Sequence, residues 1–177
     1  ETEGLRVPIT NSTNSSESTE WDNKNLICNV KFYKGRSPNP SVYFLENREY
    51  YELRANVFGY GDDHVRFALL SKGCLEWLLQ QAKSKKKKSN ESVWWPEIIH
   101  CNDWHTALIP LILRQKIKSN IPTLLTIHNL LYQGLGSLRI LDLLNMKEEE
   151  TKELKKDSDK KSWICADQDF VKQAWRT

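Results

Sequence analysis

Apolar residues recur along this chain with two different periods, which predict an alternation of strands and helices. Four runs favour strands because they are rich in apolar and β-branched residues and have turn-forming neighbours: residues 26–34, 41–45, 98–101 and 122–128. Unbroken apolar stretches within the last two, such as Ile98-Ile99, are typical of strands buried in a parallel sheet.

A helical period fills the long interval between the second and third runs. Large apolar residues recur every three or four positions from Phe67 to Leu78, which predicts a helix over residues 63–82. Asp62 or Asp63 would be its N-cap, because an aspartate side chain can accept a hydrogen bond from the backbone N–H groups of a first helical turn.

A second helix is predicted over residues 104–117, with Asp103 as its N-cap. Pro110 lies inside this helix and has no backbone N–H, so we expect a bend there. The order strand, helix, strand, helix, strand predicts βαβ units with right-handed crossovers and a parallel sheet, as in half of a doubly wound α/β fold.

The two ends of the chain have a different composition. Residues 1–24 are polar and rich in Ser, Thr and Asn, which predicts a flexible lead. Residues 136–177 are dense in Lys and Glu, with spacings that favour a partly helical tail. The sequence therefore divides into this lead, an α/β part over residues 25–135, and the tail.

Composition limits the classes of protein that remain. The 177 residues are 39% hydrophobic and 28% charged, which suits one globular domain with a core. No apolar run approaches the roughly 18 residues that span a membrane, and nothing resembles a signal peptide. Since the chain begins with Glu1, we expect a piece of a longer protein. None of the four cysteines forms a Cys-x-x-Cys pair, which gives no indication of a zinc site. Cys74 and Cys101 lie in apolar helix and strand patterns, as free thiols do, which favours a reducing, cytosolic compartment.

The positive charge is concentrated in one place. The net charge is only +3, but Lys83 and residues 85–88 form a lysine run that could contact nucleic acid. No interleaved aromatic residues or RNA-binding motif accompany it. The run is therefore better explained as a solvated loop between a helix and a strand, without a nucleic-acid partner.

Two polar and aromatic clusters follow the third and fourth predicted strands. Residues 100–110 read His-Cys-Asn-Asp-Trp-His-Thr-Ala-Leu-Ile-Pro, and residues 126–134 read Thr-Ile-His-Asn-Leu-Leu-Tyr-Gln-Gly. Open α/β sheets bind ligands just beyond the carboxyl ends of their strands. Together the clusters predict a small-molecule site.

These two clusters, in this order and spacing, resemble motifs of the glycogen and starch synthases. Residues 42–51 resemble an upstream strand block of that family, and residues 58–70 resemble its Tyr-x-Asp-(Asn/Asp)-x-x-Arg-Phe-Ala block. The resemblance covers residues 26–135. It implies a Rossmann-like parallel sheet with flanking helices, forming part of the N-terminal domain of a two-domain GT-B glycosyltransferase.

The resemblance also implies roles for individual residues. The family's equivalent of His105 lines the donor-sugar side of the cleft, and Asp62 matches a site aspartate, so both are candidate catalytic residues. The candidate substrate-binding residues are Asp103, His128, Asn129, Tyr132 and Gln133. Purely structural roles stay open: a partly buried histidine at 105, helix caps at 62 and 103, and a lid over the core at 132.

The implied reaction is glucosyl transfer with retention, from a nucleotide-glucose to the non-reducing end of an α-1,4-glucan. ADP-glucose is favoured over UDP-glucose as the donor, no metal or cofactor is required, and the location would be the cytoplasm, or a plastid for a plant-type parent. The family's Lys-x-Gly-Gly-Leu loop and second domain are missing from this sequence. We therefore expect this piece alone to be inactive.

Two alternatives to the synthase remain open at this point. One is a non-catalytic glucan-binding protein derived from a synthase, and the other is a different GT-B glycosyltransferase. The oligomeric state is left open.

Overall fold

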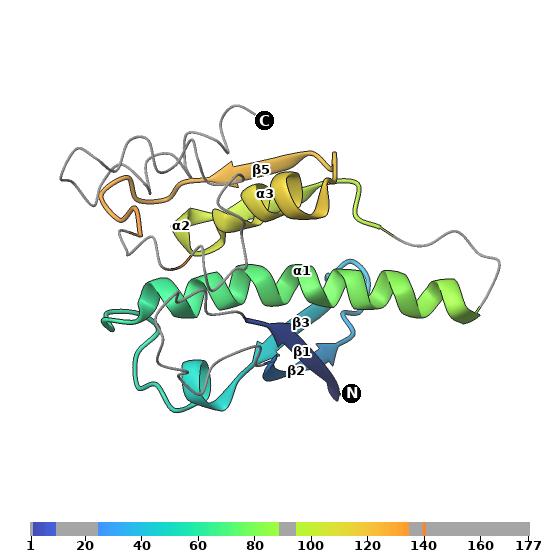
Figure 1. Cartoon of the computed structure of the whole chain (residues 1–177), viewed down its shortest axis with the longest axis horizontal. Helices are drawn as coiled ribbons and strands as arrows, with labels where there is room; N and C mark the ends of the chain where they lie inside the picture. The colour runs from blue at the N-terminus through green and yellow to red at the C-terminus, as the bar shows by residue number, and fades with distance from the viewer. Residues whose placement is uncertain (1, 10–24, 89–94, 135–139, 141–177) are drawn as a thin grey trace, which may run out of the picture.

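A computed structural model describes residues 2–9, 25–88, 95–134 and 140 of the chain. Figure 1 shows a long central helix, α1, with an antiparallel sheet on one side and a layer of short helices and parallel strands on the other. Most of the predicted tail and the predicted lead from residue 10 onward lie outside the described residues.

The antiparallel sheet has the order β1-β2-β3, formed by Thr2–Pro8, Asn25–Tyr33 and Val42–Glu46. The strands predicted over 26–34 and 41–45 are confirmed to within one residue. The flexible lead predicted over 1–24 is wrong for β1, because Leu5 and Val7 alternate with exposed residues and are buried in the register that pairs them with β2.

Helix α1 spans Asp63–Lys88 and confirms the predicted helix, but it is six residues longer. The lysine run therefore lies at the carboxyl end of a helix and not in a loop, so that prediction was wrong.

The parallel sheet pairs β4, Ile99–Asn102, with β5, Thr123–Thr126. These strands confirm the second predicted βαβ unit. The first is corrected: β3 pairs with β2 in antiparallel orientation and does not join β4. A strand's period reveals its buried face but not the strand beside it, so the sequence could not distinguish the two arrangements.

Three short helical segments replace the single helix predicted over 104–117: α2, Asp103–Thr106; α3, Leu108–Ile112; and the π-helical η2, Leu113–Ile117. The break falls at Ala107, before the predicted bend at Pro110. Pro110 lies in the first turn of α3, where backbone N–H groups have no intrahelical partner, so its missing donor costs little.

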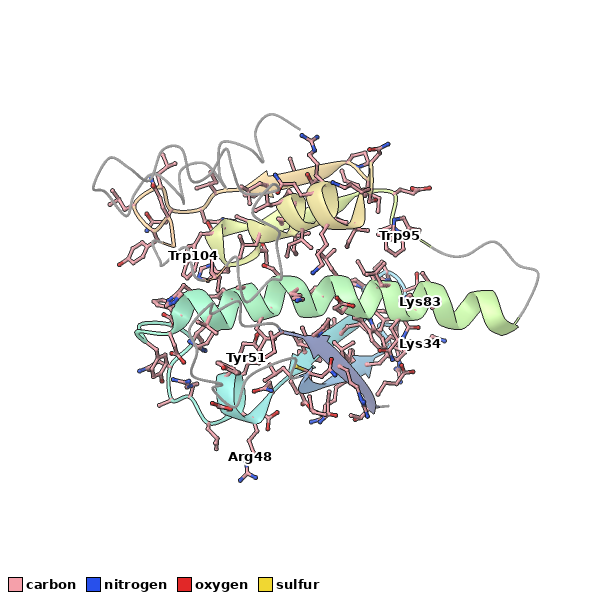
Figure 2. All side chains as sticks on the ribbon, viewed as in Figure 1. Lys34, Arg48, Tyr51, Lys83, Trp95 and Trp104 are labelled. Atoms are coloured by element: carbon pink, nitrogen blue, oxygen red, sulfur yellow. The ribbon has the colours of Figure 1, made fainter. Side chains whose placement is uncertain are left out.

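Helix α1 is apolar on two opposite faces because it packs on both sides. Leu69 and Trp77 join a core cluster with the antiparallel sheet, whereas Ala68 and Leu75 join another with α3 and β4. Gly73 lets the sheet approach closely, because a Cβ there would lie 2.6 Å from a Leu45 methyl carbon. Figure 2 shows Tyr51 and Trp104 on opposite sides of this helix.

A one-turn helix, η1, Arg48–Glu52, connects the antiparallel sheet to α1. Asn47 caps it by accepting a hydrogen bond from Tyr50 N–H at 3.0 Å and donates to the Ile27 carbonyl at 3.1 Å. Tyr51 donates its hydroxyl to the Arg66 carbonyl at 2.8 Å. These bonds fix the segment that precedes the candidate site.

Among the described residues, none of the helices combines the length and the apolar character that a membrane span requires. Cys28, Cys74 and Cys101 are free thiols, and no cluster of His, Cys, Asp or Glu in the same part of the chain could hold a metal ion.

Lys72 is the most unusual buried group on α1. Its side chain is 3% exposed, and among the described residues its ammonium has no hydrogen-bond partner. The pKa of Lys72 is lowered to about 8, mainly by burial and also by the neighbouring charge of Lys116, while Glu76 opposes the shift.

Replacing Lys72 with Met should stabilise the protein at neutral pH. The folded-state pKa lies below the ordinary value of 10.5, so the unfolded chain binds the proton more tightly than the folded chain. The free-energy cost of burying the charged ammonium is therefore fully present below pH 8. This cost diminishes as the pH rises toward 10.5. We expect Lys72→Met to gain up to about 3 kcal/mol of unfolding free energy at pH 7 and much less at pH 10.5, measured by urea denaturation.

Lys83→Met is the matched control because Lys83 lies on the same helix and is exposed. It should change the unfolding free energy little at either pH. An equal gain in both variants would show that general charge reduction, and not burial of one ammonium, causes the effect.

Candidate functional site

A cleft of about 380 Å³ opens beyond the carboxyl ends of β4 and β5. Three segments far apart in the sequence form it: the loop before α1 with its first turn, helix α2, and the loop after β5. The lining residues are Phe58, Gly59, Asp63, Asp103, Trp104, His105, Asn129 and Tyr132. This is the location at which open α/β sheets bind ligands, as the sequence predicts.

The cleft brings together four of the seven candidate site residues: His105, Asp103, Asn129 and Tyr132. Asp62, His128 and Gln133 do not line it. Their side chains bind other parts of the protein, and Gln133 closes its own turn by donating to the Leu130 carbonyl at 2.9 Å.

Four lining residues are not among the sequence candidates: Phe58, Gly59, Asp63 and Trp104. Trp104 could have been found from its place between two candidates in the motif. Asp63 is adjacent to the candidate Asp62, and the turn of the helix decides which of two neighbouring carboxylates faces the cleft. Phe58 and Gly59 begin the block 58–70 but precede its Tyr-x-Asp motif, and no other feature of the sequence marks them as site residues.

His105 is held mainly by aromatic rings. Trp104 stacks on the imidazole with ring centroids 4.4 Å apart, and Phe67 of α1 meets it edge-on at 4.3 Å. Its backbone carbonyl accepts a hydrogen bond from the buried Ser71 hydroxyl at 3.2 Å. Burial lowers the pKa of His105, although the carboxylates of Asp103 and Asp63 oppose that shift, so the imidazole is largely neutral at pH 7.

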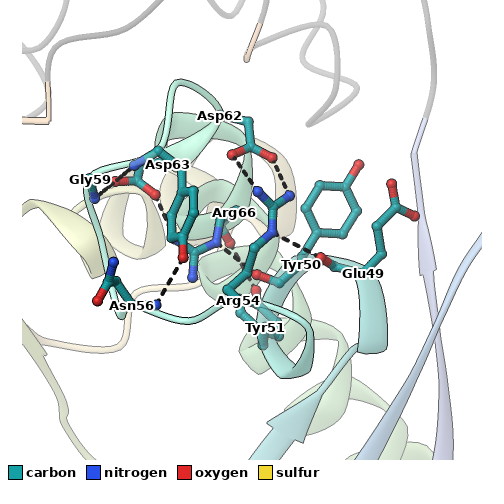
Figure 3. A network of polar contacts seen from close by, with 10 residues as sticks. Glu49, Tyr50, Tyr51, Arg54, Asn56, Gly59, Asp62, Asp63 and Arg66 are labelled. Carbon is teal, nitrogen blue, oxygen red and sulfur yellow. Dashed lines mark hydrogen bonds and ion pairs between the residues drawn. The ribbon is translucent and has the colours of Figure 1, made fainter.

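Asp63 lines the cleft and holds the loop that precedes α1. One carboxylate oxygen accepts from the backbone N–H groups of Gly59 at 2.5 Å and Tyr60 at 3.1 Å, and the other binds Arg66 at 2.5 Å (Figure 3). Burial opposes ionisation, but these donors outweigh it and hold the pKa of Asp63 below its usual range. Gly59 has a φ of 103°, a conformation that a side chain would strain.

The backbone carbonyl of Asp62, and not its side chain, accepts hydrogen bonds from the first turn of α1. Its carbonyl accepts from Val65 and Arg66 N–H, while its carboxylate binds Arg54 through both oxygens at 2.6 and 3.3 Å. The guanidinium carbons of Arg54 and Arg66 each lie 5.0 Å from the centroid of the Tyr60 ring. Cation–π contacts and ion pairs thus hold this loop as one network (Figure 3).

Asp103 does not cap α2, which corrects that prediction. The N-cap position is Asn102, without a side-chain capping bond, and Asp103 has a left-handed backbone with a φ of 55°. The Asp103 carboxylate instead accepts from His128 N–H at 2.6 Å, and His128 Nε2 lies 3.2 Å from the Asn102 side-chain oxygen. The side chain of Asp103 therefore joins the ends of the two parallel strands.

The charge of the cleft limits its ligands. Its two ionised lining residues, Asp63 and Asp103, are acidic, and no Lys or Arg of the described chain lines it. A phosphate group would meet repulsion there. A neutral polyhydroxyl ring suits it better, because Phe58, Trp104 and Tyr132 offer apolar faces and the carboxylates would stabilise developing positive charge.

Comparisons with known proteins agree with this geometry. The family model described as starch synthase catalytic domain matches residues 6–171. A glycogen synthase of Desulfitobacterium hafniense is 39% identical over 117 residues, which cover 63% of this chain and 22% of that protein. A glycogen synthase of Geotalea daltonii is 43% identical over 104 residues, or 53% of this chain and 19% of that protein. The chain thus spans about a fifth of the length of these relatives.

One solved structure has a similar fold. It is the catalytic domain of starch synthase IV from Arabidopsis thaliana bound to ADP and acarbose, with a TM-score of 0.55 and 24% identity, covering 82% of this chain and 27% of that one. The likeness supports an α/β fold that is part of a GT-B catalytic domain. Because the family model covers most of the sequence, the chain belongs to the family of starch synthase catalytic domains.

Proposed function

We propose that this chain is part of a glycogen or starch synthase that transfers glucose, with retention, from a nucleotide-glucose to the non-reducing end of an α-1,4-glucan. The observation that carries the proposal is the cleft at the strand ends, where His105 lies among aromatic and acidic residues and no Lys or Arg of the described residues lines the cleft. ADP-glucose is the proposed donor, supported by the related structure that is described as bound to ADP and acarbose.

The proposed division of labour follows from charge. This part of the protein would hold the sugar rings, with His105 and Asp62 acting in catalysis and Asn129 and Tyr132 contacting the substrate. Asp63 and Asp103 line the same cleft and would favour the positive charge that develops at the anomeric carbon. The diphosphate needs basic groups, which would have to come from elsewhere in the complete enzyme.

Asp62 does not line the cleft, so its proposed role requires the loop to shift toward the cleft. Its carboxylate is paired with Arg54, but the side chain is 36% exposed, which leaves an oxygen lone pair for a sugar hydroxyl. The free thiols at Cys28, Cys74 and Cys101 support a reducing location, for which we propose the cytoplasm or a plastid.

A non-catalytic glucan-binding protein is the second candidate. The absence of any cation among the residues lining the described cleft favours it, because a binder needs no grip on a diphosphate. Both candidates predict that the cleft binds a neutral glucan. They differ in whether the complete protein also turns over a nucleotide-glucose.

Replacing His105 with Ala should weaken binding of maltotetraose. The imidazole lines the cleft and completes an aromatic stack, so its loss should lower affinity by about tenfold, measured by isothermal titration calorimetry. His64→Ala is the control, since His64 lies in the first turn of α1 but does not line the cleft. Equal affinity in the wild type and His105→Ala would remove His105 from the site.

The isolated chain should not transfer glucose. With radiolabelled ADP-glucose or UDP-glucose and a maltooligosaccharide acceptor, we expect no labelled glucan above background, because no basic side chain of the described cleft can stabilise the leaving diphosphate. A complete glycogen synthase assayed in parallel provides the positive control. Turnover by this chain would show that a phosphate grip exists within these 177 residues.

A further inference from the structure

The carboxyl ends of β4 and β5 are joined by side chains as well as by their backbone ladder. His100 Nε2 lies 2.7 Å from the Thr126 hydroxyl within the paired strands. Beyond the end of the ladder, the Asp103 carboxylate accepts from His128 N–H and the Asn102 side chain binds His128 Nε2. His128 is the second residue after β5, so these two bonds act on a loop and not on a strand.

Asp103 makes its bond from a left-handed backbone conformation. Its φ of 55° is uncommon for any residue other than glycine, although aspartate and asparagine tolerate it better than most. The chain passes directly from β4 into α2 at this point, without an intervening loop. Such conformations persist where the surrounding structure requires them, and they gather at functional sites.

The described part of the loop after β5 is held at two points. Near its start, His128 is bonded to Asp103 and Asn102. At the last described position of this segment, Gly134 lies so close to Trp104 that a Cβ would sit 1.9 Å from an indole carbon. Between these points, the bonds that the loop makes with described residues are short internal ones, such as Leu131 N–H to the Asn129 side chain at 3.0 Å. Leu131 and Tyr132 are largely exposed.

We propose that Asn102, Asp103 and His128 form a strand-end clamp that positions Asn129 and Tyr132 in the cleft. The clamp makes His128 a positioning residue: its backbone N–H and Nε2 are both engaged, and it does not line the cleft. Asp103 lines the cleft itself and also positions the loop through its bond to His128. The effect on ligand binding rests on the proposed function, whereas the effect on the loop does not.

Variants at position 103 separate the clamp from backbone strain and from charge. Asn keeps both the acceptor oxygen and tolerance of the left-handed conformation but removes the charge. Gly relieves the conformation without an acceptor, and Ala provides neither. A clamp therefore predicts that Asp103→Asn resembles the wild type, whereas Asp103→Gly and Asp103→Ala both release the loop.

The first measurement is amide hydrogen exchange without any ligand. In Asp103→Ala and Asp103→Gly, the amides of residues 128–132 should exchange about tenfold faster than in the wild type, while Asp103→Asn stays within about threefold. Amides in the middle of α1 report global stability and should be unaffected. Unchanged exchange in Asp103→Ala, or full rescue by Asp103→Gly, would overturn the clamp.

The second measurement is maltotetraose affinity, well below the unfolding temperature. Asp103→Ala, Asn102→Ala and His128→Ala should each weaken binding about fivefold, and the double variant Asn102→Ala/His128→Ala no more than either single change at those positions. Asn120→Ala, an exposed asparagine outside the clamp, is the matched control. Wild-type affinity in Asp103→Ala would overturn the positioning role.

A wild-type chain that binds no maltotetraose would overturn the proposed function. The exchange experiment would still decide whether the clamp exists, so the two failures are distinguishable.

Discussion

The two-sided burial of α1 is the constraint on which the rest of the structure depends. One face of the helix packs on the antiparallel sheet and the opposite face packs on α3 and the parallel strands. Any sideways movement of α1 would open both cores at once. The helix therefore gives the cleft a fixed reference, because Asp62, Asp63, Phe67 and Ser71 all project from its first turns or directly precede them.

Two sets of contacts with that helix fix the geometry of the cleft. Asp63 and Arg66 hold the loop that supplies Phe58 and Gly59. Phe67 and Ser71 hold His105 by a ring contact and a hydrogen bond. The charges in these contacts are largely paired, so they cost less on burial than isolated charges would. Asp103, without a cationic partner among the bonds that hold it, leaves the cleft acidic in character.

The acidic, aromatic cleft is the basis of the division of the active site that we propose for the complete enzyme. In that proposal, this side would hold the sugar rings and stabilise developing positive charge, and basic residues elsewhere would hold the diphosphate. The division fits a GT-B fold, in which this chain contributes part of the catalytic domain. It also explains why the sequence motifs here are histidines, carboxylates and aromatics, without a phosphate-binding loop.

The sequence by itself determined the local elements and the family. Periods of apolar residues placed β2, β3, α1, β4 and β5 because burial of one face imposes a repeat on each element. The motifs placed His105, Asp103, Asn129 and Tyr132 near one another because strand ends in a parallel sheet share an edge.

Tertiary structure alone decided which strands pair, which of Asp62 and Asp63 faces the cleft, and whether Asp103 caps its own helix or holds His128. Those outcomes depend on partners distant in the chain, such as Arg54 for Asp62 and the β5 loop for Asp103, and a local pattern carries no record of a distant partner.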